Sequence, residues 1–317
     1  MFQNVWKIIL VLSLLTGLGL IISGGKEPLP SKAVGSISTE SDPQTTPTAT
    51  PGITVLPKKQ WKKKQLTGSG ALLKGRTLLI SIYLNTEKCK WTKKAKKQEK
   101  RKLKAATAYL TKQAKKYDQQ VEFITAVEEP EDLTYLCEIK KNPYQDFKAV
   151  LYMMDRMEKY VENKINTTLL RERYQTNNIG FLVHVNGTGL SQTMVHYMDY
   201  KASQFYEVSV LYHRYDGKLE TAATMAHEIL HLYGARDLYE ANGKDGISRK
   251  LVKYVKKHYS RDLMFCNLVE KKIYRIQKYK VTPISAYFVG WLDTVKEIKK
   301  FPKMKPRYPG CFGTVAK

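Results

Sequence analysis

Two histidines and a glutamate stand at positions that suit a metal-dependent hydrolase. His227 and His231 are four residues apart, and Glu228 follows the first of them. Residues four apart share one face of an α-helix, so both imidazoles can bind one cation while the carboxylate stands beside it. Catalytic zinc takes three protein ligands and keeps a fourth position open for water. The spacing therefore predicts a Zn²⁺ site in which Glu228 takes the proton of an attacking water.

The residues around this triplet favour a helix that ends soon after it. Residues 219–226 include several good helix formers, and Gly234 suits the left-handed residue that often terminates a helix. A sharp turn at Gly234 would bring the Asp237 carboxylate back to the metal as a third ligand. A bare histidine pair with a glutamate also arises by chance on amphipathic helices, but Gly234 and Asp237 at fixed offsets argue against chance.

Together, His227, Glu228, His231, Gly234 and Asp237 resemble the extended motif of the metzincin zinc proteases. The aspartate in the last position is similar to the snapalysin group. The resemblance implies an α+β or α/β fold with a mixed five-stranded sheet, an active-site helix and a smaller, irregular C-terminal lobe. It also implies a zinc-dependent endopeptidase.

A second element of that family is a turn with a methionine beneath the zinc. Met264, between Leu263 and Phe265, is similar to it. Some metzincins carry a tyrosine two residues after the methionine, which binds the zinc reversibly. Cys266 occupies that position here, so we expect no tyrosine ligand from the turn, and Tyr259 is a minor candidate for stabilising the oxyanion.

Hydrophobic periodicity predicts the elements that would position these residues. The order is strand, helix, strand, helix, three strands and the motif helix. The strands are expected at residues 76–83, 120–127, 179–185, 193–200 and 205–212, and the helices at 92–117 and 146–174, with a closing helix at 284–298.

In metzincins the fourth strand is the antiparallel edge of the sheet and borders the cleft. An exposed edge can bind an extended peptide by strand addition. The resemblance therefore places Gln192, Thr193, Met194 and His196 on the substrate rim.

The N-terminal part predicts export. Residues 8–22 are apolar or small, which is long for a signal peptide and short for a membrane span, so residues 1–25 are a signal peptide or, slightly favoured, a membrane anchor. Residues 26–66, rich in Pro, Ser and Thr and then in Lys, are expected to form a disordered stalk. Residues 67–317 remain for one catalytic domain, with an upper lobe to 234 and a lower lobe from 235. The protein is thus expected at the cell surface or secreted.

Four cysteines in an exported chain favour disulfides. Cys89 and Cys137 each follow a predicted parallel strand and would reach the same edge of the sheet. The expected pairs are therefore Cys89–Cys137 and Cys266–Cys311, with free buried thiols as the alternative.

The formal net charge is +25, with 54 Lys and Arg against 29 Asp and Glu. Such a field attracts anionic membrane lipids or cell-wall polymers and favours acidic substrates. The lysines are dispersed and no aromatic and basic module accompanies them, so no nucleic-acid partner is expected.

Two functions of different classes follow. The first is a zinc endopeptidase that hydrolyses peptides or proteins through a zinc-bound water, with Glu228 as general base. The second is a non-catalytic surface-binding module with a structural or vestigial zinc site. Glu228 favours the enzyme, because a structural site fills its fourth position with a protein ligand and needs no adjacent carboxylate. A gluzincin-like protease with Glu240 or Glu270 as third ligand is the other alternative, against which Gly234 and Met264 argue.

Overall fold

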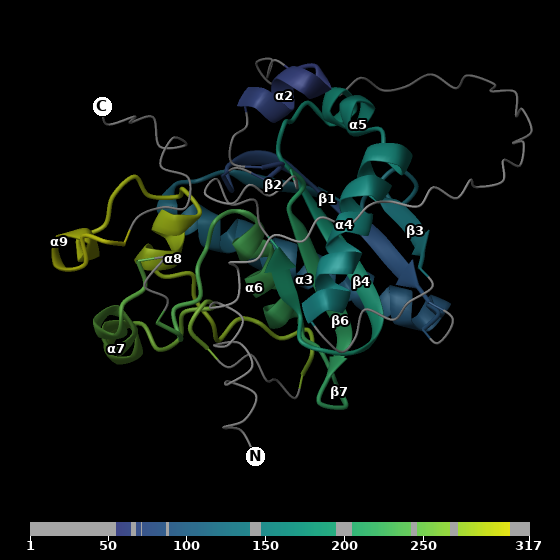
Figure 1. Cartoon of the computed structure of the whole chain (residues 1–317). Coiled ribbons are helices and arrows are strands. Elements are labelled where there is room, and N and C mark those ends of the chain that lie inside the picture. Colours follow the sequence, from purple (N-terminus) through teal and green to yellow (C-terminus); the bar gives the residue numbers. More distant parts are fainter. Residues whose placement is uncertain are drawn as a thin grey trace, which may run out of the picture. The chain divides into compact units, whose positions relative to one another are not determined.

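A seven-stranded, mostly parallel sheet lies at the centre of the computed structural model (Figure 1). Its main path consists, in order, of β2 (Val121–Thr125), β1 (Gly75–Asn85), β4 (Ile179–Thr188), β6 (Val208–Tyr215) and β5 (Gln192–Met194). β3 (Thr134–Glu138) follows β2 along the same edge of β1, and β7 (Lys218–Leu219) pairs with β6. Within this sheet β5 and β7 are the antiparallel strands. The fold is therefore mixed α and β as expected, but β3 and β7 enlarge the predicted five-stranded sheet.

The structure describes residues 55–64, 68–70, 72–86, 89–139, 147–194, 205–241, 246–266 and 272–304, with the backbone alone for 63–64, 147–155 and 194. All of them belong to the unit Thr50–Lys317. Within these ranges, no helix is both long enough and apolar enough to cross a membrane. The predicted signal peptide or anchor lies outside them, as does most of the predicted stalk.

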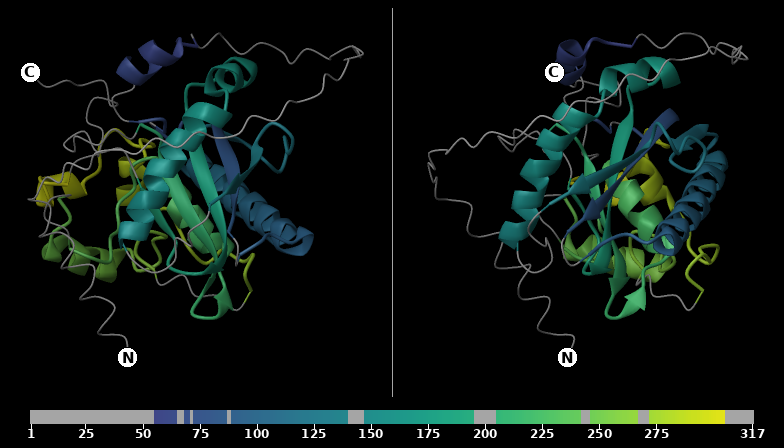
Figure 2. Two further views of the ribbon diagram at one scale, coloured as in Figure 1. Left: turned by 45° about the vertical axis from the view of Figure 1, so that its right-hand side comes forward. Right: turned by 90° about the vertical axis from the view of Figure 1, so that its right-hand side faces the viewer.

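Helices cover both faces of the sheet (Figure 2). α3 (Lys93–Ala114), followed by the short 3-10 helix Lys115–Tyr117, packs with α6 (Ala222–Leu232) on one face, and α4 (Phe147–Lys164) lies on the other. Successive side chains of β1 point to opposite faces. Leu79 accordingly joins the core that contains α3 and α6, whereas Ile80 joins the core that contains α4. Burial on both faces explains why the middle of β1, from Leu78 to Leu84, is apolar at every position but Ser81.

The lysine-rich end of the predicted stalk is folded. Lys58–Lys64 forms α2, in which the Trp61 side chain is fully buried. Its ring packs edge-on against Phe205, with 4.8 Å between the ring centroids, and against the guanidinium of Arg171. The prediction of a disordered stalk over residues 26–66 is therefore wrong for its last part. Its lysines suggested a segment exposed to solvent, but the buried Trp61 side chain anchors the helix to the domain.

The helix expected over residues 146–174 is interrupted. α4 ends at Lys164, and α5 (Thr167–Tyr174) begins after Asn166. The Asn166 side chain accepts a hydrogen bond from the Leu169 N–H at 3.1 Å. An asparagine oxygen that binds a backbone donor in this way starts a new helix and competes with a continuous one.

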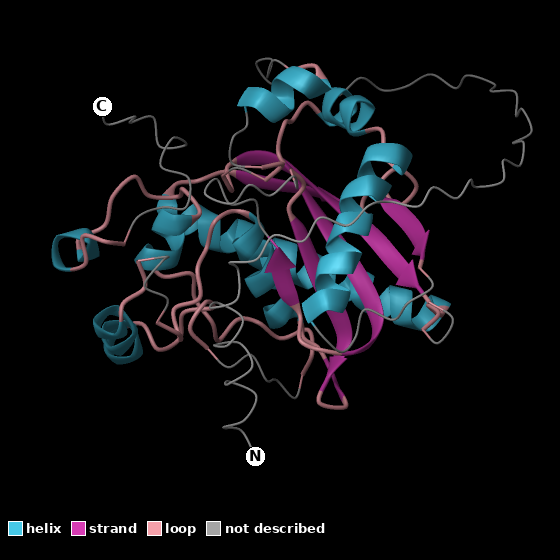
Figure 3. Ribbon diagram, viewed as in Figure 1, coloured by secondary structure: helices cyan, strands magenta, loops and turns pink. Residues whose placement is uncertain are grey.

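The region after α6 contains short helices joined by long loops (Figure 3). They are α7 (Arg249–His258), α8 (Pro283–Phe288) and α9 (Glu297–Lys300). α7 was not predicted, and α8 and α9 replace the single closing helix expected at residues 284–298. Gly290, at φ +83°, follows α8 in the left-handed conformation that glycine tolerates best, and so separates the two helices.

Cys89 and Cys137 are free thiols, so the predicted disulfide between them is wrong. Cys137 lies within β3 rather than after a strand, opposite Leu84 of β1, and its side chain is buried in the core that contains α4. Cys89 lies in the segment after β1. Cys266 is also a free thiol, and its predicted partner Cys311 lies outside the described ranges.

Candidate metal centre

The motif helix α6 begins and ends at defined caps. The Thr221 hydroxyl accepts a hydrogen bond from the Thr224 N–H at 3.1 Å and so caps the N-terminus. At the other end, Gly234 has a φ of +97°, which confirms the predicted left-handed residue. The chain turns back at this glycine, and the residues that follow run close to the end of the helix.

This turn brings Asp237 next to the two histidines. His227 Nε2 and His231 Nε2 are 3.1 Å apart, and Asp237 Oδ1 lies 3.2 Å from the first and 3.3 Å from the second. The three atoms form a nearly equilateral triangle. The three residues predicted as ligands are therefore brought together.

The triangle has the dimensions of a zinc site. Ligand atoms of a tetrahedral site with bonds of about 2.0–2.1 Å are about 3.3 Å apart. Asp237 Oδ1 is buried, and within the described part of the chain no hydrogen-bond donor satisfies it. An anionic oxygen and two imidazole nitrogens this close repel one another unless a proton or a cation lies between them. The donor set and the orphaned oxygen thus both fit Zn²⁺.

Backbone carbonyl groups fix the orientation of both imidazoles. His227 Nδ1 is 3.0 Å from the Leu263 carbonyl oxygen, and His231 Nδ1 is 2.9 Å from that of Ala235. A carbonyl accepts a hydrogen bond only from a protonated nitrogen, so Nδ1 carries the proton and Nε2 keeps its lone pair. In the neutral rings both lone pairs are thereby directed to the centre of the triangle.

The turn that contains Met264 supports the same centre. Leu263 supplies the carbonyl that binds His227, and the Met264 carbonyl accepts the Leu238 N–H at 2.9 Å, directly after Asp237. The Met264 side chain is fully buried. Two consecutive carbonyls of this turn therefore hold the ring of His227 and the backbone next to Asp237.

A buried carboxylate maintains the turn. Asp262 accepts hydrogen bonds from the Met264 N–H at 2.7 Å, the Ser285 hydroxyl at 2.8 Å and the Thr282 N–H at 2.9 Å. Burial raises the pKa of Asp262 above its ordinary value, while these donors oppose the shift. The turn is thus tied to α8, far along the chain.

Glu228 is buried beside the ligands, with 4% of its surface exposed. Its Oε2 accepts a hydrogen bond from the Thr193 hydroxyl at 2.7 Å. Thr193 belongs to β5, so the edge strand of the sheet contacts the predicted general base directly. Gln192 lies on the same strand. Of the other predicted rim residues, Met194 has an undescribed side chain and His196 lies outside the described ranges.

Electrostatics keep the third ligand ionised. Burial opposes a charge on Asp237, but His231 and His227 hold the pKa of that carboxyl well below its usual range. Burial also opposes a charge on His227, yet the Asp237 carboxylate, 3.2 Å from Nε2, raises the pKa of His227 to about 9. Without an ion a proton therefore takes its place at Nε2, and metal binding would release that proton. The carboxylate is therefore the anion of the site.

Tyr239 is a site residue that the sequence reasoning missed. Its ring stacks on His227, with 6.4 Å between centroids and 23° between planes. Burial, and then the charges of Asp237 and Glu228, raise the pKa of its hydroxyl far above the ordinary value, and the hydroxyl also hydrogen-bonds to Asp237. The phenol therefore stays protonated, and it directs its proton to Asp237. In the sequence only its position two residues after Asp237 could have indicated that Tyr239 lies at the site.

Tyr259, the minor candidate, lies elsewhere in the network. Its hydroxyl donates to Glu297 Oε1 at 2.6 Å, which commits the proton to α9. Of the alternative third ligands, Glu240 is not part of the triangle, and Glu270 lies outside the described ranges.

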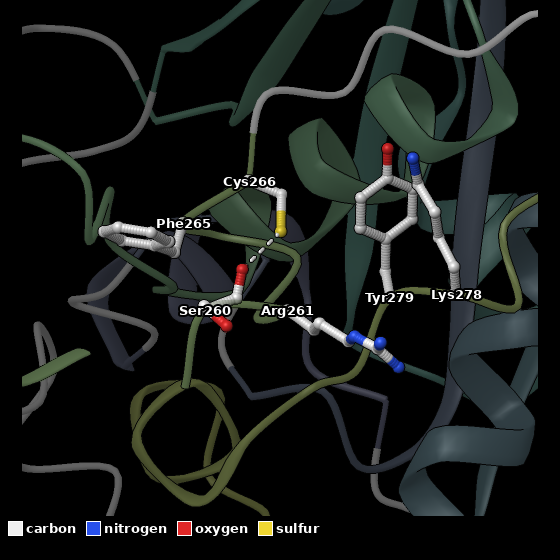
Figure 4. A pocket seen from close by; sticks show the side chains of 6 residues that line it. All are labelled: Ser260, Arg261, Phe265, Cys266, Lys278 and Tyr279. Atoms are coloured by element: carbon white, nitrogen blue, oxygen red, sulfur yellow. Dashed lines mark hydrogen bonds between the residues drawn. The ribbon is translucent and has the colours of Figure 1, made fainter. Parts of the chain in front are cut away.

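A cavity of about 410 Å³ lies beside the turn that contains Met264 (Figure 4). It is lined by Ser260, Arg261, Phe265, Cys266, Lys278 and Tyr279. The Cys266 thiol donates to the Ser260 carbonyl at 3.1 Å, and burial raises its pKa to about 11. Neither Glu228 nor any of the three ligands lines this cavity, so it is separate from the metal centre.

Comparison with known proteins adds no relative: no family model, no curated protein and no solved structure matches this chain. The function must therefore be argued from the geometry of the metal centre and the residues around it.

Proposed function

We propose that this protein is a zinc-dependent endopeptidase. The observation that carries the proposal is the triangle of His227 Nε2, His231 Nε2 and Asp237 Oδ1, with sides of 3.1 to 3.3 Å and an orphaned buried oxygen at one corner. These three residues would hold the ion. When bound, zinc would polarise a carbonyl group and make water more acidic.

The remaining chemistry belongs to the side chains. Glu228 would accept the proton of the attacking water and pass it to the leaving amine, since a buried carboxylate adjacent to the ligands can serve both atoms in turn. Tyr239 directs its one proton to Asp237 in this structure. With a cation to neutralise that carboxylate, the phenol would turn its proton to the oxygen on which negative charge develops.

The edge strand supplies a reason to expect peptide substrates. β5 pairs with β6 in an antiparallel register, with Thr193 opposite Ser209, and lies at the end of the sheet path beside α6. A peptide that adds to such an edge is bound mainly through its backbone, in an extended form and without need of a free terminus. This favours cleavage within a chain over removal of terminal residues.

The proposal is tested on the full-length protein by metal analysis and by cleavage of a peptide library blocked at both ends. We expect one zinc per chain and internal cleavage. Glu228→Ala should keep the zinc and lose at least about 100-fold in turnover, since a general base contributes that much or more. Asp237→Ala should instead lose zinc to a mild chelator.

Glu240→Ala is the matched control, because it removes a nearby carboxylate that is not part of the triangle. It should keep both zinc and turnover. Zinc loss in Glu228→Ala, or zinc retention in Asp237→Ala together with loss in Glu240→Ala, would contradict the assigned roles. Stoichiometric zinc without any cleavage would favour the non-catalytic, structural alternative.

A further inference from the structure

Two hydroxyl groups of the sheet, those of Thr193 and Ser209, contact Glu228. Thr193 Oγ1 lies 2.7 Å from Glu228 Oε2 and 3.0 Å from its carbonyl oxygen. Ser209 Oγ lies 2.7 Å from Thr193 Oγ1 and 3.2 Å from the same carbonyl oxygen. The two residues are directly opposite in the pairing of β5 with β6. Sheet and helix are therefore joined at this point by a polar cluster.

The number of protons decides how this cluster is bonded. Each hydroxyl carries one proton and can also accept, whereas an ionised carboxylate only accepts. A hydrogen bond to a charged acceptor is stronger than one to a neutral acceptor. The Thr193 proton is therefore assigned to Glu228 Oε2, its closest acceptor apart from the Ser209 hydroxyl. Ser209 then donates either to Thr193 Oγ1 or to the Glu228 carbonyl, and both choices leave Thr193 as the donor to the carboxylate.

Packing alone does not require these hydroxyls. Ser209 is fully buried, and α6 otherwise packs on the sheet with apolar residues such as Ile229 and Leu230. Valine and alanine have nearly the shapes of threonine and serine, and would fill the same space without burying polar atoms. The hydroxyls find their acceptors at Glu228, beside the metal ligands. Their placement thus serves the carboxylate more than the core.

We propose that Thr193 is a positioning residue for the general base, supported by Ser209. It holds Oε2 and so leaves Oε1 of Glu228 as the oxygen that exchanges the proton. Among the described residues no hydrogen bond occupies Oε1. Because Thr193 belongs to the edge strand, the element expected to bind the peptide also fixes the angle of the base. The inference rests on the proposed endopeptidase function.

The test compares Thr193→Val with wild type in the full-length protein. Loss of a hydrogen bond to a charged group, with a base free to rotate, should lower kcat by about 10- to 100-fold. KM and zinc content should stay at the wild-type values, because Thr193 acts on the base and not on the ligands. Thr193→Ser restores the hydroxyl and should recover most of kcat. Ser209→Ala should have a smaller effect of the same kind.

Thr224→Val is the matched control. Thr224 also donates to a glutamate, Glu220 Oε2, at 2.8 Å, and lies on α6 as well. Its loss should leave kcat unchanged. A kcat of Thr193→Val within about twofold of wild type, or a fall explained by lost zinc, would overturn the assignment, since broken hydrogen bonds at a working base cost more.

The two proposals fail in different ways. If the wild type binds zinc but cleaves no peptide, the endopeptidase function fails. Crystal structures of wild type and Thr193→Val then decide the assignment by themselves. A new or mixed rotamer of the Glu228 carboxylate in the variant alone would support the positioning role of Thr193. An unchanged rotamer would contradict it.

Discussion

Tyr239 shows how much the chemistry of a single side chain depends on its neighbours. The phenol stacks on His227 and hydrogen-bonds to Asp237, and burial together with the neighbouring carboxylates keeps it protonated. In the proposed mechanism a cation would neutralise Asp237 and free this proton for the developing oxyanion. Tyr259, closer to the turn in sequence, donates to Glu297 and has no such role.

We therefore expect Tyr239→Phe to lower kcat by about 100-fold while zinc stays bound, which is the usual cost of losing one donor to an oxyanion. Tyr259→Phe is the control, and should leave turnover unchanged but cost about 1 kcal/mol in the free energy of unfolding, the usual value of one hydrogen bond. Steady-state kinetics and urea unfolding measure the two effects. Equal turnover in both variants would remove Tyr239 from the mechanism.

At this site the sequence predicted the residues that lie at fixed distances along the chain from His227. His227 and His231 share a helix face with Glu228 beside them, and Gly234 adopts the left-handed conformation that its offset required. Thr193 was expected to lie on the substrate rim, and its hydroxyl contacts Glu228. Contacts of that kind join residues that only the folded sheet brings together, so no spacing in the sequence could report them.

At the scale of elements, periodicity identified the buried strands and missed elements whose pattern is weak. β1, β2 and β4 were predicted from apolar runs and are confirmed. β3 was missed because it has five residues and a single buried side chain, Cys137. α2 was read as part of a solvated stalk because five of its seven residues are lysines. Its buried apolar side chain is Trp61, and a single apolar residue produces no hydrophobic periodicity in the sequence.

The contribution of α2 can be measured through that tryptophan. Trp61 is fully buried between Phe205 and Arg171. Trp61→Ala should lower the free energy of unfolding by about 3–5 kcal/mol, the usual cost of truncating a buried aromatic side chain. Leu169→Ala is the control, because 46% of the Leu169 surface is exposed, and it should change stability little. A similar, small effect in both variants would mean that α2 does not stabilise the domain.

At the scale of the whole molecule, a charged cluster lies inside the core rather than on the surface. Glu99 of α3 is buried between Lys102 Nζ at 2.6 Å and His213 Nδ1 at 2.5 Å, and His184 Nδ1 lies 3.8 Å from its other oxygen. Burial opposes the anion, but Lys102 and the two histidines hold the pKa of Glu99 well below its usual range. Burial lowers the pKa of His184. The cluster ties α3 to β4 and β6.

These two pKa shifts act in the same direction on stability. The unfolded chain takes up a proton at His184 below about pH 6.5 and at Glu99 below about pH 4.3, whereas the folded protein resists both. Depressed pKa values in the folded state therefore give a stability that is complete at neutral pH and falls in acid. His184→Gln should lose less unfolding free energy than wild type between about pH 7 and about pH 5.

His258→Gln is the control for this effect, since His258 is exposed on α7. Its unfolding free energy should show the wild-type dependence on pH. Urea unfolding at the two pH values gives the comparison. The residues of the candidate metal centre are present in every variant, so their contribution cancels from the difference. An unchanged pH dependence in His184→Gln would show that this histidine does not contribute to acid sensitivity.

The packing of Trp61 also has a consequence for the order in which the nascent chain can fold. Its indole N–H donates to the carbonyl of Asn177, which is 116 residues further along the chain. At about 5–20 residues per second, a ribosome needs roughly 6–23 s to add that stretch, far longer than a helical turn needs to form. Throughout this interval the first folded element of the domain is complete in sequence but has nowhere to dock. α2 can therefore dock only late, after Asn177 and then Phe205 have been synthesised.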